Sequence, residues 1–183
     1  MVRTVLQTTG QHEISIDCPV DLRKYLPSKT SSGITNLTAN ITCQISTDDD
    51  LTSFESTLQA VKKISRSSKK QLSPSANLLF IGTDFQEKKL HFRKKKLLEK
   101  MYSIPKTSFT NIGIIDEEKL VFEGSALTDC FICGSLKYAP FFQVAATTFR
   151  GELTLSTNLH GTMQDHAWQE EFLEKMISEF SSK

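Results

Sequence analysis

The feature that most constrains the fold is a strict alternation of side chains along residues 35–46, TNLTANITCQIS. Successive side chains of a β-strand point to opposite faces, so this pattern is typical of a strand with one buried and one polar face. Such a strand needs partner strands and a second layer to cover its apolar side. The apolar or small positions are Leu37, Ala39, Ile41, Cys43 and Ile45.

The rest of the N-terminal half alternates between strand and helix signals. Residues 13–18 alternate in the same way and predict a strand that Pro19 ends, while residues 21–27 predict one turn of helix. Residues 2–11, by contrast, resemble a linker. We therefore expect the first regular element to begin near Glu13.

Two helices are expected in the middle of the chain. Three aspartates at 48–50 are typical of a helix N-terminus, and residues 51–64 carry apolar side chains at helical spacing. The segment 67–76 is expected to end this helix. A second helix is predicted over 85–101, and Pro105 prevents its continuation.

The C-terminal third predicts three strands, over residues 126–136, 141–149 and 152–159. The last two are separated by Arg150 and Gly151, which suit a two-residue hairpin turn because glycine accepts a positive φ angle.

Asp165 is expected to cap a last helix with one apolar stripe and a charged opposite side. The chain then forms a single domain over residues 1–183 of the α/β (α+β) class. We expect a two-layer sandwich, with helices packed on a mixed, largely antiparallel sheet. The stripe consists of Trp168, Phe172, Leu173, Met176, Ile177 and Phe180.

Composition limits the classes of partner. The chain has 22 basic and 21 acidic residues and a formal net charge of +1, so we expect no nucleic-acid partner. No apolar run approaches the roughly 20 residues of a membrane span, and the N-terminus has no signal-peptide core. Four cysteines are too few for a disulfide scaffold. These features predict a cytoplasmic protein.

Cys130 and Cys133 form a C-x-x-C pair, which suggests a redox or zinc site. A strand would place residues three apart on opposite faces, and no second ligand pair has suitable spacing. We therefore expect the two thiols to pack, and we expect no metal site.

Two further groups of residues have alternative interpretations. The basic run at 88–96, KKLHFRKKK, is either a phosphate site or a solvated helix face, and the second is favoured. His160 with Asp165 could form a general base and its orienting acid, although a helix-capping turn also accounts for the pair.

Several segments together resemble the condensation-type acyltransferases, in the order in which that family has them. CPVDLRKYLP at 18–27, followed by Asn36, resembles the family's V-D-L-R and G-N segments. FTNIGIID at 109–116 resembles its S-N-L-G segment. LVFEGSALTDCFICGSLKYAPFFQVAATTFRGELTLSTNL at 120–159 resembles the close of the fold, and the resemblance covers residues 10–181.

The resemblance implies a chloramphenicol acetyltransferase-like fold and a specific arrangement of substrates. In that family two similar halves face each other across a tunnel, in which a coenzyme A or carrier-protein phosphopantetheine thioester meets an alcohol or amine. The family's His-His-x-x-x-Asp-Gly motif is absent here, so the chain resembles the C-terminal half alone. It also lacks the Asp-Phe-Gly-Trp-Gly segment, which favours the alcohol acetyltransferase or polyketide-associated branch.

A half of this kind implies a partner, either the missing N-terminal half or a second copy of the chain. The half alone is expected to have no catalytic residue, no tightly bound cofactor and no transferase activity. A non-catalytic binding module of the same fold is the alternative function. A half-fold is expected to expose an apolar wall that invites pairing.

The resemblance also assigns roles to individual residues. Thr110 and Asn111 match the segment that lines the tunnel, where a hydroxyl or amide can donate to an oxyanion. Gly113 would let the pantetheine arm approach. The alternative is that Asn111 only closes a turn. Asp21, Arg23 and Asn36 are expected to be structural.

Overall fold

The computed structural model describes residues 1–25, 37–46, 51, 53–80 and 106–181, and for Lys24 and residues 71–80 it describes the backbone alone. Several sequence-based expectations lie outside these residues. They concern Asn36, the aspartates at 48–50, the helix at 85–101 and the basic run at 88–96.

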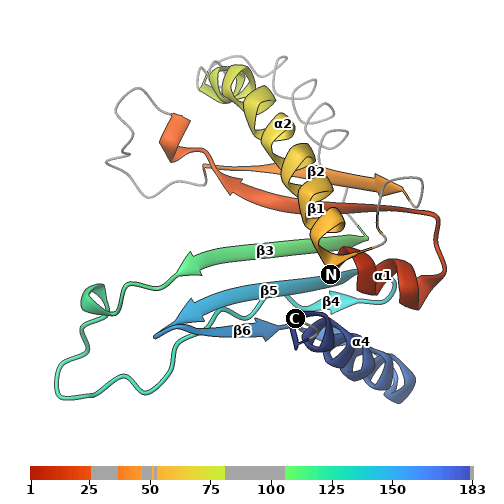
Figure 1. Ribbon diagram of the computed structural model, residues 1–183. Helices are drawn as coiled ribbons and strands as arrows, with labels where there is room; N and C mark the ends of the chain where they lie inside the picture. Colours follow the sequence, from red (N-terminus) through yellow and green to blue (C-terminus); the bar gives the residue numbers. More distant parts are fainter. Residues whose placement is uncertain (26–36, 47–50, 52, 81–105, 182–183) are drawn as a thin grey trace, which may run out of the picture.

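The centre of the molecule is a mixed five-stranded sheet (Figure 1). Its first and last pairings are antiparallel and account for most of the paired positions, while the two central pairings are parallel. The expected mixed sheet is therefore confirmed. From edge to edge the strands are β2 (Thr38–Ser46), β1 (Glu13–Asp21), β3 (Thr107–Ile114), β5 (Phe142–Phe149) and β6 (Glu152–Ser156).

Strands β1 and β2 follow the alternation in the sequence. Their register sets Ile14 opposite Ile45 and Ile16 opposite Cys43, and all four side chains are buried on the same face. The prediction that Pro19 ends the first strand is wrong, because β1 continues to Asp21. Proline lacks a backbone N–H and enters a strand only where no ladder bond is required of it.

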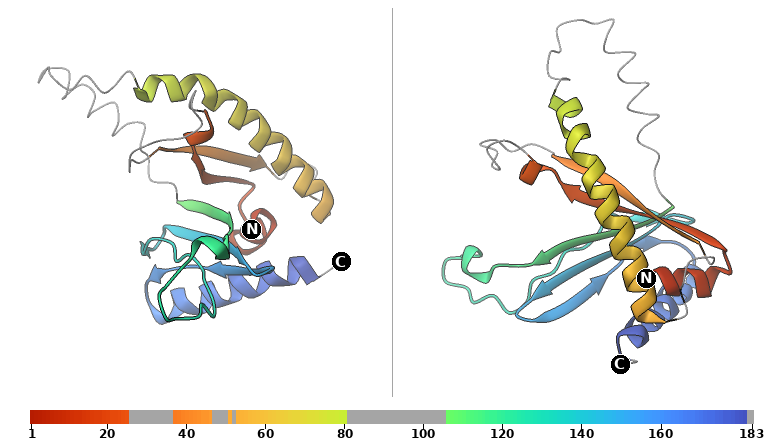
Figure 2. Two further views of the ribbon diagram at one scale, coloured as in Figure 1. Left: turned by 90° about the vertical axis from the view of Figure 1, so that its left-hand side faces the viewer. Right: turned by 45° about the horizontal axis from the view of Figure 1, so that its top comes forward.

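Three helices cover one face of the sheet: α1 (Val2–Thr9), α2 (Phe54–Phe80) and α4 (Met163–Ser181). Figure 2 shows α2 and α4 at opposite ends of the sheet; α2 packs on β2, and α4 packs on Phe142 of β5. Burial of their apolar sides against the sheet is the main favourable term in the fold. The core residues are Val5, Leu6, Ile14, Ile16, Cys43, Ile45, Phe142, Val144, Phe172 and Met176.

Helix α1 corrects the expectation of a linker at residues 2–11. Its threonines and valines are weak helix formers, but Val5 and Leu6 are buried in the core and this tertiary packing overrides local preference. The helix ends at Gly10, whose φ of 64° is in the left-handed region that glycine favours.

Helix α2 is 27 residues long, so the prediction that residues 67–76 end it is wrong. Lysine, glutamine and leucine in that segment are good helix formers, and they prevail over the serines and Pro74. Within the described part of the chain, no helix combines the length and the apolar character that crossing a bilayer requires.

The C-terminal hairpin is confirmed. Residues 142–149 form β5, and Arg150 and Gly151 turn the chain with φ angles of 48° and 83°. Both values are positive, as a type I′ turn requires. The strand predicted over 152–159 divides into β6 and the short β7 (Leu159–His160), which pairs with β4 (Lys137–Tyr138).

The strand predicted over 126–136 is wrong, because these residues have no ladder partner within the described parts of the chain. They instead cross the face of β5 and β6 that the helices leave free. The Ile132 N–H donates to Thr147 Oγ1 (3.0 Å), and Ser156 Oγ donates to the Ile132 carbonyl (2.6 Å). Side-chain hydroxyls thus replace strand pairing here.

Candidate functional site

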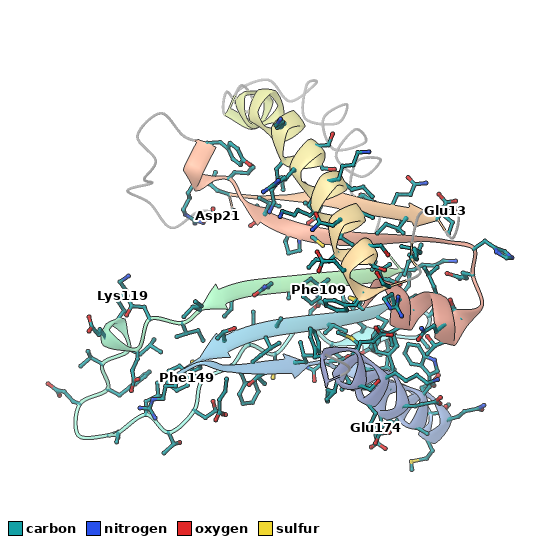
Figure 3. The ribbon with its side chains drawn as sticks, in the orientation of Figure 1. Glu13, Asp21, Phe109, Lys119, Phe149 and Glu174 are labelled. Atoms are coloured by element: carbon teal, nitrogen blue, oxygen red, sulfur yellow. The ribbon has the colours of Figure 1, made fainter. Side chains whose placement is uncertain are left out.

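The strongest candidate for a functional site lies where the central strands end. Strands β1, β3 and β5 run parallel, so their carboxyl ends are at the same edge of the sheet (Figure 1). Figure 3 labels Asp21 at the end of β1 and Phe149 at the end of β5. Ligands of sheets with parallel strands bind preferentially at this edge.

Strands β1 and β3 separate as they approach this edge. Among the described residues their pairing is confined to two positions, Ile16 with Thr107 and Asp17 with Ser108. Beyond them β1 continues on β2 and β3 continues on β5. Pro19 lies two residues past the last pair between β1 and β3. At this position β1 makes no hydrogen bond to β3, so the missing N–H of proline leaves no bond unmade.

The segment 110–113 forms the carboxyl end of β3. Asn111 Oδ1 accepts a hydrogen bond from the Gly113 N–H at 2.8 Å. Gly113 has a φ of 81°, and the pairing of β3 with β5 shifts between Asn111 and Ile114. The asparagine therefore closes a turn at a β-bulge, and glycine at this φ relieves the strain that a side chain would cause.

Thr110 and Asn111 do not share a face. Adjacent residues of a strand point to opposite sides, and the register pairs Thr110 with Ala145 and Asn111 with Ala146. Ala146 lies two residues after the core residue Val144 and therefore on the same, helix-covered side of the sheet. Asn111, which pairs with Ala146, points to that side too. The half-buried Thr110 points to the other side, and one ligand on one face can meet only one of the two side chains.

Asn111 and three other side chains form a patch that none of the described helices covers, and we call it the bare face. Ile114 pairs with Thr148, and Thr148 pairs with Leu153, so all of them lie on the helix side. The helices end short of these strand ends (Figure 1). As a result Ile114 is 80% exposed and Leu153 is 53% exposed. The members of the bare face are Asn111, Ile114, Thr148 and Leu153.

Sequence reasoning found Asn111 but missed the other three members of the bare face. The bulge in β3 decides that Ile114 lies on this side, and the hairpin register places Leu153 there. The one available signal was the Arg-Gly turn, which fixes the register of a two-residue hairpin and hence the face of each residue.

Asp21 and Arg23 lie at the end of β1. Asp21 Oδ1 accepts from both the Arg23 backbone N–H (3.0 Å) and Arg23 Nη1 (3.1 Å). Arg23 begins the 3-10 turn η1 (Arg23–Tyr25), where a turn was predicted. The pair thus holds the chain as it leaves the strand.

Cys18 is not a candidate nucleophile. Burial raises the pKa of Cys18, beside the divergence of β1 and β3, to about 11, so it is protonated at neutral pH. Cys130 is half-buried, and Cys133 is exposed rather than packed. Within the described ranges no cluster of histidine, cysteine and carboxylate side chains could hold a metal ion.

His160 and Asp165 have separate surroundings. His160 stacks on Tyr138 with ring centroids 5.0 Å apart. Asp165 accepts hydrogen bonds from the Thr162 N–H (2.7 Å) and Thr162 Oγ1 (2.8 Å) and donates its own N–H back to that hydroxyl. This reciprocal capping box at the start of α4 accounts for Asp165 without a catalytic role.

The capping box predicts a dependence of stability on pH. Hydrogen bonds from Thr162 lower the pKa of Asp165 below its ordinary value of 3.8. The folded state therefore gains stability above that value and loses it as the pH falls through the lowered pKa. Thr162→Ala should reduce the free energy of unfolding by about 0.5–2 kcal/mol at neutral pH. Urea unfolding at a series of pH values measures both effects, and a variant equal to the parent at neutral pH would contradict the box.

The chain was also compared with known proteins. No family model, no curated protein and no solved structure matches it.

Proposed function

We propose that this chain is the C-terminal half of a condensation-type acyltransferase of the alcohol acetyltransferase or polyketide-associated branch, with a chloramphenicol acetyltransferase-like fold. In this proposal the bare face forms one wall of the tunnel that holds a coenzyme A or phosphopantetheine thioester. The observation that carries it is an apolar sheet surface, with Ile114 80% exposed and Leu153 53% exposed, around a single oriented amide. Exposed apolar surface of this kind is typical of an interaction or ligand site.

The orientation of Asn111 supports a role in the reaction. Its Oδ1 is occupied by the Gly113 N–H, which leaves the Nδ2 end of the amide to donate. An amide donor fixed in this way can stabilise the oxyanion of a tetrahedral intermediate as the acyl group leaves the thioester. Because Asn111 and not Thr110 points to the bare face, Asn111 is the residue we assign to this role.

The bare face also indicates what a partner must supply. None of its four side chains titrates near neutral pH, so it provides no general base to deprotonate an alcohol or amine. That base would come from a partner half that covers the bare face. We therefore expect the isolated chain to transfer no acyl group from acyl-CoA.

Photo-crosslinking from the bare face tests the proposal. A photoreactive amino acid in place of Ile114 should capture, in the native cell, a polypeptide that carries a His-His-x-x-x-Asp-Gly motif. The reconstituted pair should then transfer acyl groups from acyl-CoA to alcohols or amines, while the chain alone does not. The same photoreactive residue at Thr42, which is exposed on the other face of β2, is the matched control.

A non-catalytic binding module is the second candidate. It is favoured by the Asn111–Gly113 hydrogen bond, because closing a turn is by itself a sufficient role for an asparagine. Capture of a partner without the histidine motif, or a reconstituted pair without transferase activity, would establish the module and reject the enzyme. Acyl transfer by the purified chain alone would reject the proposal that the general base lies on a separate partner half.

A further inference from the structure

The outward side of α2 carries a row of cations. Residues at spacings of three and four along this helix lie on one side of it, and they line one shallow hollow on the surface. The apolar Val61 and Ile64 pack against the core from the opposite side. The row contains Lys62, Lys63, Arg66 and Lys70, with Gln59 and Ser67 between them.

Among the residues that the structure describes, the four cations of the row have no partner. All four are exposed, and among the described residues none of them takes part in an ion pair. Glu55, in the first turn of the helix, accepts a hydrogen bond from Gln59 instead. Like charges at this spacing destabilise a helix. A contribution to the stability of α2 therefore does not explain the row.

The formal net charge of +1 conceals this concentration of positive charge. A local row of cations attracts polyanions whatever the total charge of the protein. The expectation that the chain has no nucleic-acid partner depended on the total alone. The exposure of the cations in 59–70 and their spacing along the helix indicate instead that a polyanion can bind here.

We propose that this side of α2 binds the phosphate backbone of double-stranded nucleic acid. Three of the four cations are lysines, whose flexible ammonium groups bind phosphates as point charges. An acidic protein surface is the poorer match, because lysine is depleted in protein–protein interfaces, whereas arginine is enriched there. A membrane is also the poorer match, because no apolar side chain among the described residues lines the hollow for insertion into lipid.

The position of α2 suits a duplex. The helix lies over the edge strand β2, at the periphery of the molecule (Figure 2). A helix in this position can lay its outward row of cations along the phosphates of a duplex, in DNA and RNA alike. The hollow has no aromatic side chain among its described residues, so no base can stack there and binding is independent of sequence. This inference does not depend on the proposed acyltransferase function.

Fluorescence anisotropy with labelled 20-base-pair DNA and RNA duplexes of random sequence tests the proposal. Four phosphate contacts predict a slope of log affinity against log salt of about −3.6, and hence about a 100-fold loss of affinity between 50 and 200 mM salt. The double variant Lys63→Glu/Lys70→Glu should bind at least about 10-fold more weakly at the lower salt and reduce the slope by about two.

Lys106→Glu/Lys119→Glu makes the same change in net charge away from α2 and should leave both quantities unchanged; circular dichroism verifies that each variant retains its helices. Equal losses in the two double variants would overturn the proposal, as would the absence of duplex binding at 50 mM salt. Binding of phosphatidylserine vesicles or polyglutamate as tightly as duplex, with the same dependence on Lys63 and Lys70, would also overturn it in favour of a different partner.

Discussion

Phe172→Ala should destabilise the protein more than any other single truncation in α4. The Phe172 side chain is fully buried, and its ring meets Phe142 edge-on with centroids 4.9 Å apart and Trp168 at 5.3 Å. Removing a buried phenylalanine ring costs about 3–5 kcal/mol in transfer and cavity terms. For a chain of this length the loss corresponds to a fall in Tm of about 10 °C, measurable by calorimetry or urea unfolding.

Phe180→Ala is the matched control on the same helix. Phe180 is 50% exposed and meets Phe54 at 6.3 Å, so its truncation should cost less than about 1 kcal/mol. Similar losses in the two variants would show that α4 does not bury Phe172 as described. The contrast matters because both residues belong to the apolar stripe that the sequence predicts.

The stripe illustrates how far periodicity determines burial. Helical spacing places all six residues on one side of α4, but the neighbouring elements cover only part of that side. Phe172 and Met176 are buried, while Ile177 and Phe180 remain about half exposed. Sequence spacing therefore predicts which side of a helix faces the core, whereas the extent of the neighbouring layer decides how much of that side is buried.

Strands were predictable where alternation and turn chemistry agreed. Strand β2 alternates without interruption, and β5 ends at an Arg-Gly turn, so both were found. Residues 126–136 have strand-like composition but make hydrogen bonds to side chains of β5, β6 and Asn158. Pairing between distant segments is a tertiary property, so local propensity could not distinguish this segment from a strand.

The candidate site was predictable in its location but not in its orientation. Asn111 and Gly113 interrupt an apolar segment, and that interruption is the bulge at the end of β3. Which face each side chain takes depends on register with β5, which is set by residues more than 30 positions away. For this reason the sequence suggested that Thr110 and Asn111 act together, whereas the strand separates them.

Asn111→Asp is the variant that separates a catalytic role from a structural one. Aspartate keeps the oxygen that accepts from the Gly113 N–H and so preserves the turn, but it has no amide N–H to donate. If Asn111 stabilises an oxyanion, kcat of the reconstituted pair should fall about 100- to 1,000-fold, as for the loss of one oxyanion donor. The free energy of unfolding should stay within about 0.5 kcal/mol of the parent.

Two further variants complete this experiment. Asn111→Ala removes both the donor and the acceptor, so it should lose stability as well as activity. Thr110→Val changes the adjacent residue, which points to the opposite face, and should leave kcat unchanged. If Asn111→Asp retains full activity while Asn111→Ala is only less stable, the asparagine closes a turn and does nothing more. If Thr110→Val is the variant that loses activity, the reaction takes place on the other face of the sheet, and the bare face serves only for docking.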